Sequence, residues 1–465
     1  MKRIVILSLA TLMVGCGIYK PYSRPEVKTD GLYGDVAQDD TTSLGNMSWQ
    51  EIFTDPLLQE LIAEGLDHNT DLQIAHLRVS EAEAALKSAR LAYLPSFNVA
   101  PQGSVSSFDN ANTAKIYNIP ITASWEVDIF HGVTNAKRKA KAVYTQSKDY
   151  EQAVKTQLIA GVANLYYTLL MLDSQYEVSR QTAAKWQEGV RTMQAMKNAG
   201  MANSVAVAQY EANQLAVEVS LHDMEHKIST IENSLATLLG RTAQRIERGK
   251  LEEQVVPEEL LVGVPVQLLS QRPDVRASEA GLMSAFYATS SARSALYPHI
   301  TLSGSAGWTN KGGMGVVNPG KALLTVAGNL LQPIFNAGQN RARVKIAKAQ
   351  QEQALLSFQQ TLLNAGAEVN NALKQSQTAR AKKDLRQQQV EELERAVENT
   401  QLLMQYSANH TYLEVLTAQQ SLLAAKMSQI ADRFDEIQGV VNLYHALGGG
   451  RDKDADPQTQ EASKR

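Results

Sequence analysis

The feature that most constrains the fold of this chain is an internal duplication at about half its length. Seven residues between positions 71 and 95 recur 203 positions later, between 274 and 298. Eight more between positions 129 and 158 recur 205 positions later, between 334 and 363. The offset grows by two where a hairpin loop is expected. Each copy spans roughly 200 residues, far more than one unit of a solenoid, so the sequence predicts one architectural module that is present twice.

The N-terminus indicates export and lipid attachment. Residues 1–15 have the charged start and short apolar run of a signal peptide. They lead into Cys16, the only cysteine of the chain, which follows Met13, Val14 and Gly15 as the acylated residue of a bacterial lipobox would. Acyl chains on Cys16 would hold the protein in membrane lipid through apolar burial. The alternative is an ordinary signal peptide with an incidental cysteine. We expect residues 16–54 to form an extended, lipid-anchored segment.

Composition excludes some functions and favours long helices. The chain has 465 residues and a formal net charge of -3, which is too small to indicate a nucleic-acid partner. Aromatic residues make up only 6% of the chain, and the long segments are rich in Ala and Gln. This mixture suits long helices better than a large globular core.

Both copies contain the same order of predicted elements. The first repeat, residues 55–240, has two helices, a β-hairpin at 96–130 with alternating apolar and polar residues, and a long helical hairpin at 133–239. The second repeat, residues 266–448, has its β-hairpin at 298–335 and its helical hairpin at 337–447. A linker at 241–265 joins the two repeats, and a tail at 449–465 follows them.

The helical hairpins are too long for a compact domain. Apolar residues spaced by three and four along them are typical of a coiled-coil seam. The first long helix, at ~1.5 Å per residue, would extend ~100 Å. These helices therefore bridge a distance.

The β-hairpins indicate an oligomer. Their four strands are each about long enough to cross a bilayer when tilted, since ~9–11 residues suffice. An open sheet of four strands would leave edge amides unpaired in lipid, and closed membrane barrels need at least ~8 strands. Several chains would therefore share one barrel, and two, three or four chains all satisfy the strand arithmetic. The alternative is a stalked lipoprotein whose strands do not enter the membrane.

Three motifs carry a resemblance to a known family. They are Cys16 with the segment 19–25 (Tyr-Lys-Pro-Tyr-Ser-Arg-Pro), the segment 269–274 (Leu-Ser-Gln-Arg-Pro-Asp) and the segment 412–418 (Tyr-Leu-Glu-Val-Leu-Thr-Ala). Together with the duplication they resemble the TolC-type outer membrane factors, and specifically the OprM-like lipoproteins that serve resistance-nodulation-division (RND) efflux pumps. Arg272, Pro273 and Asp274 form the signature part of this match. The resemblance extends from Cys16 to about residue 450.

The resemblance implies an α+β membrane protein in the outer membrane of a Gram-negative bacterium. Such proteins are homotrimers that share a twelve-stranded transmembrane β-barrel, with a long α-helical barrel in the periplasm and a mixed belt at its equator. They are passive exit ducts for drugs and other small molecules. The implied partners are a periplasmic adaptor protein, an inner membrane RND pump and outer membrane lipid. No enzymatic activity, cofactor, metal or nucleic acid is implied.

The resemblance also places sites at the periplasmic end of the helices. Gly200 and Met201 in one helix turn, and Asn409 and His410 in the other, should contact the adaptor. Inward-facing rings of the residues that begin the last helix should close the channel: Leu413, Glu414 and Thr417. Three Glu414 carboxylates in a narrow ring would repel one another and favour cations over anions. Thr417 stands where the family often has an acid, which puts a second acidic ring in question. The alternative for Glu414 is a solvated helix residue.

Other signals indicate less. His222 and His226 fit an inverted zinc-peptidase pattern, but their apolar neighbours belong to the coiled-coil seam, so we expect a helix surface and no metal site. The run 312–315 lacks the lysine-bearing helix of a nucleotide loop and indicates the tip of an outer hairpin. The basic residues at 137–141 indicate a solvated face near a membrane surface.

Two rival functions remain open. Members of the family can also serve as ducts for protein secretion, and neighbouring genes for an adaptor and an RND pump, or for an ATP-driven exporter, would discriminate. A structural coiled-coil lipoprotein without a pore is the rival from another class. It would give no conductance steps in planar bilayers.

Overall fold

The computed structural model describes residues 21–25, 47–107, 113–255, 272–309, 321–406 and 412–450. The expected signal peptide, Cys16, Asn409, His410, the run 312–315 and the tail from residue 451 lie outside these residues. The described chain forms two compact units. Unit 1 contains residues 21–25, 77–149 and 276–361, and unit 2 contains the remainder. Each unit draws on both sequence repeats, and the repeat boundaries at 55–240 and 266–448 stay a prediction.

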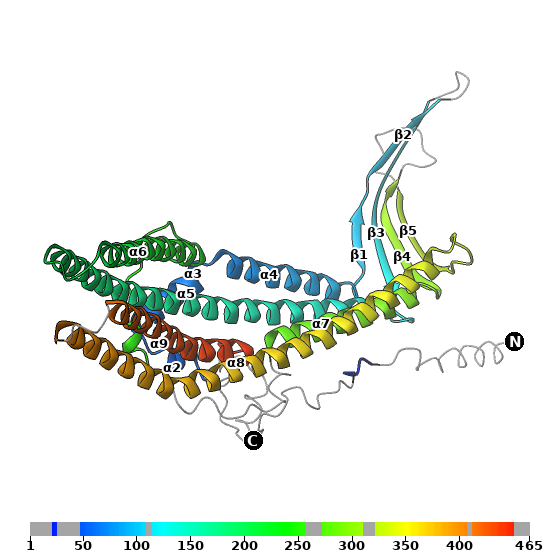
Figure 1. Cartoon of the computed structure of the whole chain (residues 1–465). Coiled ribbons are helices and arrows are strands. Elements are labelled where there is room, and N and C mark those ends of the chain that lie inside the picture. Colours follow the sequence, from blue (N-terminus) through cyan, green and yellow to red (C-terminus); the bar gives the residue numbers. More distant parts are fainter. Residues whose placement is uncertain are drawn as a thin grey trace. The chain divides into compact units, whose positions relative to one another are not determined.

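Most of the described chain is helical, as Figure 1 shows. The helices are α2 (Trp49–Ile52), α3 (Pro56–His68), α4 (Thr70–Leu91), α5 (Gly132–Asn198), α6 (Ser204–Leu238), the short 3₁₀ helix η2 (Leu251–Glu253), α7 (Pro273–Ser294), α8 (Gln339–Tyr406) and α9 (Tyr412–Ala446). The strands are β1 (Ser96–Val99), β2 (Gln102–Ser106), β3 (Ala114–Val127), β4 (His299–Thr309) and β5 (Lys321–Leu331). Among the helices described, none combines the length and the sustained hydropathy that crossing a bilayer requires.

The strands of unit 1 form one antiparallel sheet in the order β1-β3-β4-β5, with β2 also paired to β3. The register joins the two sequence hairpins, because Val127 of β3 lies opposite Ile300 of β4 and the pairing continues for ten residues. Within the described chain, β1, β2 and β5 pair on one side only, so this sheet is open at both edges.

The two faces of the sheet differ in polarity. On one face Ile119 lies opposite Trp308 and Trp125 opposite Leu302, and small residues alternate with large ones where Gly304 faces Val326. On the other face most paired residues of β3 and β4 are polar, as at Ser124 and Ser303. Val326 is 78% exposed in the single chain. An exposed apolar face beside a polar face is the pattern of a strand between lipid and an aqueous lumen.

The first hairpin differs from the expectation of two continuous strands at 96–130. Its first strand is interrupted between Val99 and Gln102. Pro101 has no backbone N–H to donate to a ladder. The N–H of Ala100 donates to the carbonyl of Pro120 at 3.3 Å and keeps the two pieces on the same partner strand.

The helices of unit 1 lie in the order α4, α5, α7, α8. Tyr93, just after α4, hydrogen-bonds Thr134 of α5 at 2.8 Å. The Arg138 guanidinium of α5 lies 5.8 Å from the ring centre of Tyr287 on α7. Thr289 of α7 donates to the carbonyl of Ala347 on α8 at 3.1 Å.

The described part of the N-terminal segment lies against α7. Arg24 pairs with Glu279 at 3.2 Å, and the ring of Tyr22 meets that of Phe286 edge-on, with 5.7 Å between centroids. Burial, followed by the nearby Glu279 carboxylate, raises the pKa of Tyr22 to about 12. Residues 21–25 therefore contact α7 through Tyr22 and Arg24, and the wider extended segment at 16–54 stays a prediction.

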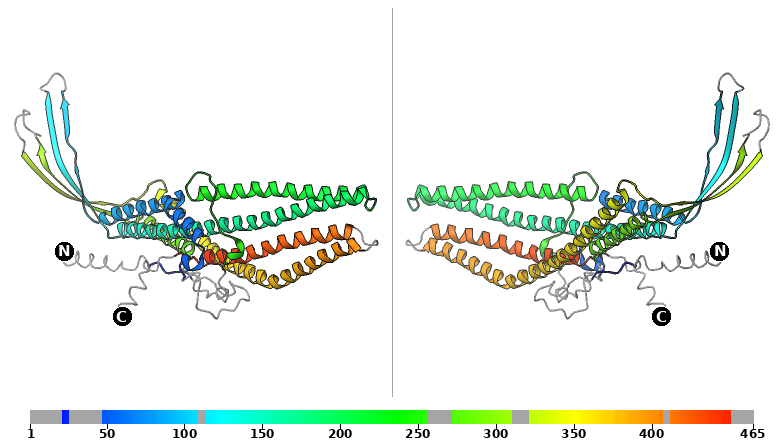
Figure 2. Two further views of the ribbon diagram at one scale, coloured as in Figure 1. Left: turned by 90° about the vertical axis from the view of Figure 1, so that its left-hand side faces the viewer. Right: turned by 90° about the vertical axis from the view of Figure 1, so that its right-hand side faces the viewer.

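Unit 2 contains two antiparallel helical hairpins, α5 with α6 and α8 with α9, which Figure 2 shows from two sides. The segment between α2 and α3 packs onto the long helices α5 and α9. Phe53 is 2% exposed and meets the ring of Tyr444 edge-on at 5.4 Å. Asp55, which caps α3, also accepts hydrogen bonds from Tyr166 at 2.6 Å and from Gln254 at 2.8 Å.

The described part of the linker, residues 241–255, is fixed to the same unit by ion pairs. Arg241 binds Glu64 at 2.8 Å. Arg248 binds Asp173 and Glu232, both at 2.5 Å. Burial opposes the charge of Arg248, but the hydrogen bonds that its guanidinium donates to the two carboxylates outweigh burial and raise its pKa. The start of the linker is thus an ordered part of unit 2.

Candidate functional site

The turn between α5 and α6 is a tight helix-to-helix connection. Gly200 has a φ of 78°, a conformation that glycine adopts without steric penalty. The N–H of Met201 donates to the carbonyl of Met196 at 2.8 Å, and the side chain of Asn203 accepts from Ala206 and caps α6. Met201 is 72% exposed. The turn therefore presents a hydrogen-bonded backbone and an exposed apolar side chain.

Aromatic residues hold the hairpin together just behind this turn. Trp186 of α5 and Tyr210 of α6 are buried with their ring centroids 5.3 Å apart. Gly189 permits this contact, because an added Cβ would lie 2.9 Å from the Tyr210 ring. Leu416 of α9 belongs to the same core. The apolar spacing predicted the seam, but the sequence did not identify which aromatic residues fill it.

The first turn of α9 separates the predicted gate residues from this core. Val415 is 2% and Leu416 6% exposed, whereas Leu413 is 52% exposed. Glu414 and Thr417 are also exposed, and the Thr417 hydroxyl donates to the carbonyl of Leu413 at 2.8 Å. Leu413, Glu414 and Thr417 thus share one helix face, opposite the packed face.

A groove of about 440 Å³ lies between the two helical hairpins near the same end. Thr192 and Lys185 of α5 line one side, and Gln401 of α8 and Gln419 of α9 line the other. The Gln420 amide of α9 donates to Asn213 of α6 at 2.6 Å, which joins the hairpins directly. The groove is largely polar.

The signature residues Arg272, Pro273 and Asp274 form a joint between α7 and the end of α9. Arg272 is 2% exposed. Its guanidinium donates to Asp274 at 2.7 and 3.0 Å, to Glu368 of α8 at 2.7 Å, and to the backbone carbonyl of Ala446 at 2.7 Å. Burial opposes ionisation of Asp274, but the bonds from Arg272 outweigh it and lower its pKa. The signature therefore caps the C-terminus of α9.

The first repeat contains the same joint in neutral form. Asn69 stands 203 positions before Arg272, is 6% exposed and donates to the carbonyl of Leu238 at the end of α6, at 2.8 Å. Its side-chain oxygen accepts from the N–H of Leu72 at 2.9 Å. The repeat offset could have identified Asn69, but only the structure shows that Asn69 and Arg272 each donate to a backbone carbonyl at the end of a helix.

The two histidines on α6 lie on an exposed surface. His222 is bound to Glu225 at 3.1 Å, and Glu225 also accepts from Tyr176 of α5 at 2.9 Å. These hydrogen bonds, that of Tyr176 first, lower the pKa of Glu225. Within the described ranges, no group of three or more His, Cys, Asp or Glu side chains could hold a metal ion.

The sequence matches an established family and curated relatives over nearly its whole length. The model of the family "Outer membrane efflux protein" matches residues 61–241 and 264–449. The cation efflux system protein CusC of Escherichia coli K12 is 26% identical over 459 residues, which covers 96% of this chain and 99% of CusC. The pyoverdine export outer membrane protein OpmQ of Pseudomonas aeruginosa is 29% identical over 476 residues, with 98% of each chain covered.

Solved structures have the same fold. Crystal structures of CusC superpose with a TM-score of 0.81 at 26% identity and cover 93% of this chain and 100% of that one. The open state of the Neisseria gonorrhoeae MtrE outer membrane channel gives a TM-score of 0.84 at 25% identity, with 94% and 99% coverage. These are TolC-like channels, whose family is trimeric and works with adaptor proteins and inner membrane pumps.

The match covers both sequence repeats, and the likeness extends from the sheet to the helical hairpins. Efflux channels of this kind lie in the outer membrane of Gram-negative bacteria and extend into the periplasm. The chain therefore belongs to the outer membrane efflux protein family and is a TolC-like outer membrane channel of an efflux system.

Proposed function

We propose that this channel is a passive exit duct, closed at its periplasmic end by rings of Leu413, Glu414 and Thr417. The observation that carries the proposal is the division of the first turn of α9, where Val415 and Leu416 are buried and the three gate residues lie on the opposite face. In a trimer each of these side chains occurs three times. Three carboxylates in a narrow ring attract cations and repel anions.

Planar-bilayer recordings of the purified protein test the gate. Glu414→Gln should reduce the preference for cations over anions, because the substitution removes one charge from each subunit while preserving side-chain size. Glu398→Gln is the matched control, since Glu398 is an exposed carboxylate on α8 and does not belong to the first turn of α9 that carries the predicted gate. Ion selectivity and resting conductance that are the same for Glu414→Gln and the unmodified protein, across a pH series, would reject this assignment.

A periplasmic adaptor should dock on the tips of the helical hairpins, and an RND pump should deliver cargo through it. The tight turn at Gly200 with the exposed Met201 supports this proposal, as does the polar groove between the hairpins. Asn409 and His410 would contribute from the second turn.

Site-specific crosslinking tests the docking. Met201→Cys should crosslink to the adaptor through a thiol-reactive bifunctional reagent, and Val219→Cys, 61% exposed on α6, should not. Equal yields from both positions would contradict docking at the tip.

The cargo is not determined by the duct. The relatives' names specify cations for CusC, pyoverdine for OpmQ and toluene for TtgC of Pseudomonas putida, at 26%, 29% and 26% identity respectively. Similar identity to channels for such different cargo supports a duct that conducts small molecules without recognising them. Exchange of the pump partner should therefore change the exported compounds, whereas substitutions in the lumen should not.

We assign no catalytic step to the chain and a lipid anchor to Cys16. Replacing His222 and His226 together with Ala should leave export unchanged, and loss of export with an intact trimer would revive a metal role. Cys16→Ser should abolish incorporation of labelled palmitate. Continued incorporation by that variant would contradict acylation at this residue.

A further inference from the structure

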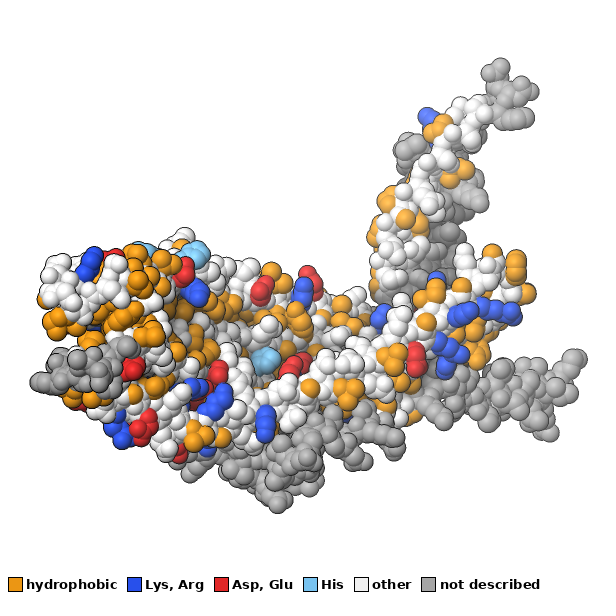
Figure 3. Space-filling view, in the orientation of Figure 1, with side chains coloured by type: hydrophobic (Ala, Val, Ile, Leu, Met, Phe, Trp, Pro, Cys, Tyr) orange, Lys and Arg blue, Asp and Glu red, His pale blue; other side chains and the backbone are white. Residues whose placement is uncertain are grey.

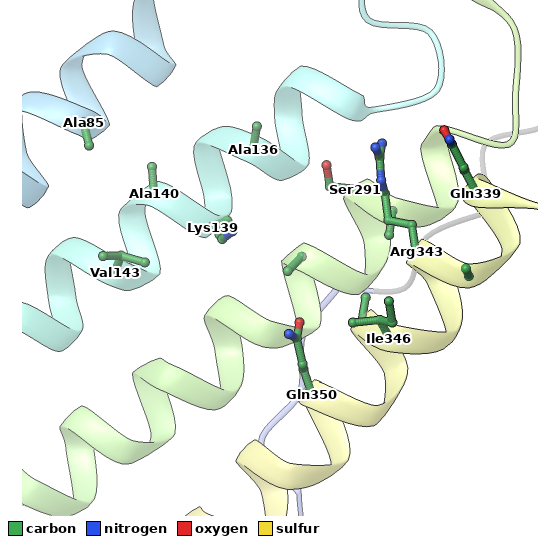
Figure 4. Close-up of a pocket in the computed structure, with 14 residues that line it drawn as sticks. Ala85, Ala136, Lys139, Ala140, Val143, Ser291, Gln339, Arg343, Ile346 and Gln350 are labelled. Atoms are coloured by element: carbon green, nitrogen blue, oxygen red, sulfur yellow. The ribbon is translucent and has the colours of Figure 1, made fainter. Parts of the chain in front are cut away.

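A groove of about 780 Å³ lies in unit 1, where α5 meets α7 and α8 (Figure 4). Its floor is the small-residue face of α7, formed by Ala288, Ser291 and Ala292. The flanking faces belong to α5, with Ala136, Ala140 and Val143, and to α8, with Ala342, Arg343 and Ile346. Ala85 of α4 also lines the groove. Of the described residues that line it, Lys139 and Arg343 are charged.

The duplication implies a second groove of the same construction where two subunits meet. In a closed ring, α8 of one subunit lies beside α4 of the next, because the helix order α4, α5, α7, α8 repeats. Edge residues of the single chain support this arrangement. Phe130 stacks on Tyr297 within the chain, with ring centroids 5.1 Å apart, whereas its counterpart Phe335 is 87% exposed. Such a residue is available to the partner subunit.

The repeat offset of 205 gives the lining of this junction groove. The positions of α8 that correspond to Ala136, Ala140 and Val143 are occupied by Arg341, Lys345 and Lys348. The positions of α5 that correspond to Ala342, Arg343 and Ile346 are occupied, on the partner subunit, by the partner's Lys137, the partner's Arg138 and the partner's Lys141. Six cations replace the two of the groove within the chain.

The two helix segments that carry these cations contain no acidic residue, and the exposed acidic residues beside the corresponding part of α4 are Glu81 and Glu83. The sequence contains no Asp or Glu from Gly132 to Lys148 or from Gln339 to Gln350. Among the described residues, none of the six cations forms an ion pair, although Lys137 lies over the ring of Tyr93 and Arg138 over that of Tyr287 within the chain. Lysine and arginine near a helix N-terminus also oppose the helix dipole. Figure 3 shows Lys and Arg side chains gathered over the part of α8 nearest the strands. A groove with this charge is suited to bind an anion.

We propose that phosphate-bearing headgroups of anionic phospholipid bind in the three junction grooves and hold neighbouring subunits together. This inference rests on the proposed trimeric duct. The end of β5 at Leu331 and the start of α8 at Gln339 place the groove at the periplasmic surface of the membrane. Many phospholipid phosphates lie in that layer, and they stay there because their acyl chains hold them in the membrane. Each bound phosphate bridges cations of two subunits that would otherwise repel.

The test compares trimer stability in phosphatidylcholine vesicles with and without phosphatidylglycerol. The full-length protein is heated in each, and dissociation of the trimer is followed by gel mobility. Phosphatidylglycerol should raise the dissociation temperature of the unmodified protein. The variant R341Q/K345Q/K348Q should lose this rise, with affinity for the anionic lipid reduced roughly 100-fold, about fivefold for each cation removed. The variant R341K/K345R/K348R should retain it.

A matched control removes the same charge elsewhere. K227Q/K374Q/K383Q changes three exposed lysines of unit 2 and should respond to phosphatidylglycerol as the unmodified protein does. Inorganic phosphate in phosphatidylcholine vesicles distinguishes the source. A rise in dissociation temperature with free phosphate alone would overturn the lipid assignment, as would an equal lipid effect in the unmodified protein and R341Q/K345Q/K348Q. Conductance recorded from the same samples separates the lipid site from the proposed duct. If the protein is not a duct, conductance is absent from the unmodified protein and from every variant.

Discussion

Replacing Arg272 with Ala should lower the free energy of unfolding by about 2–4 kcal/mol. Arg272 is 2% exposed and makes four hydrogen bonds that join α7, α8 and the C-terminus of α9. Its loss would leave the carbonyl of Ala446 without its guanidinium donor in a buried position, at a cost of about 1–3 kcal/mol. The side chains of Asp274 and Glu368 are 41% and 46% exposed, so water can hydrate both carboxylates when Arg272 is removed. Losing their ion pairs with Arg272 therefore adds only about 1 kcal/mol to the destabilisation.

Denaturant unfolding in detergent, followed by helical circular dichroism, measures this change. Arg272→Lys should lose less stability than Arg272→Ala, because lysine keeps the positive charge. It should still be less stable than the unmodified protein, because lysine lacks the planar fork that reaches three acceptors at once. Asn69→Ala tests the neutral version of the joint and should cost about 1–2 kcal/mol. Arg395→Ala is the control, since Arg395 pairs with Glu392 on the exposed surface of α8.

A double-mutant cycle between Arg272→Ala and Glu368→Gln isolates the contact across helices. The two changes should be less costly together than the sum of their separate effects, because the side chains share one interaction. If Arg272→Ala were no more destabilising than Arg395→Ala, the joint would not hold the helix ends. Strict additivity in the cycle would likewise refute the ion pair with Glu368.

Two further outcomes follow from the same region. Gly240→Ala should destabilise the protein more than Gly200→Ala in the same unfolding assay. Both glycines have a positive φ, but of the two only Gly240 would place the new Cβ 2.7 Å from a backbone oxygen, that of His68. Equal losses of stability in the two variants would contradict this reasoning. Burial lowers the pKa of His445, despite the opposing carboxylates of Glu368 and Asp274 and with a further contribution from Arg272; the unfolded chain therefore binds more protons, and stability should fall as pH drops below the ordinary histidine pKa of about 6.5. His445→Gln should flatten that fall, and His226→Gln, on the exposed surface, should not.

Local sequence determined the elements themselves. The change from period two to period three-four predicted helices directly after each β-hairpin, and the structure begins α5 at Gly132 and α8 at Gln339. These predictions succeeded because amphipathic periodicity and turn residues act over a few neighbours. The interruption between β1 and β2 was missed, although Pro101 was visible in the sequence, because a ladder break depends on which partner strand lies opposite.

The partners of individual residues required tertiary structure. The resemblance selected Arg272, Pro273 and Asp274 as a signature, but nothing in the sequence places Arg272 against the carbonyl of Ala446, which lies 174 residues later. Likewise, Asn69 could be aligned with Arg272 through the repeat offset, but only the fold shows that both cap the end of the helix that returns to them.

By itself, the sequence determined a duplicated module of strands and very long helices, and that an open sheet could not remain alone in lipid. The tertiary structure decided that each compact unit combines both repeats, and that the joints at Asn69 and Arg272 use different chemistry for one purpose. The physical reason is that periodicity is encoded in adjacent residues, whereas hydrogen bonds between distant residues depend on how the chain returns to itself.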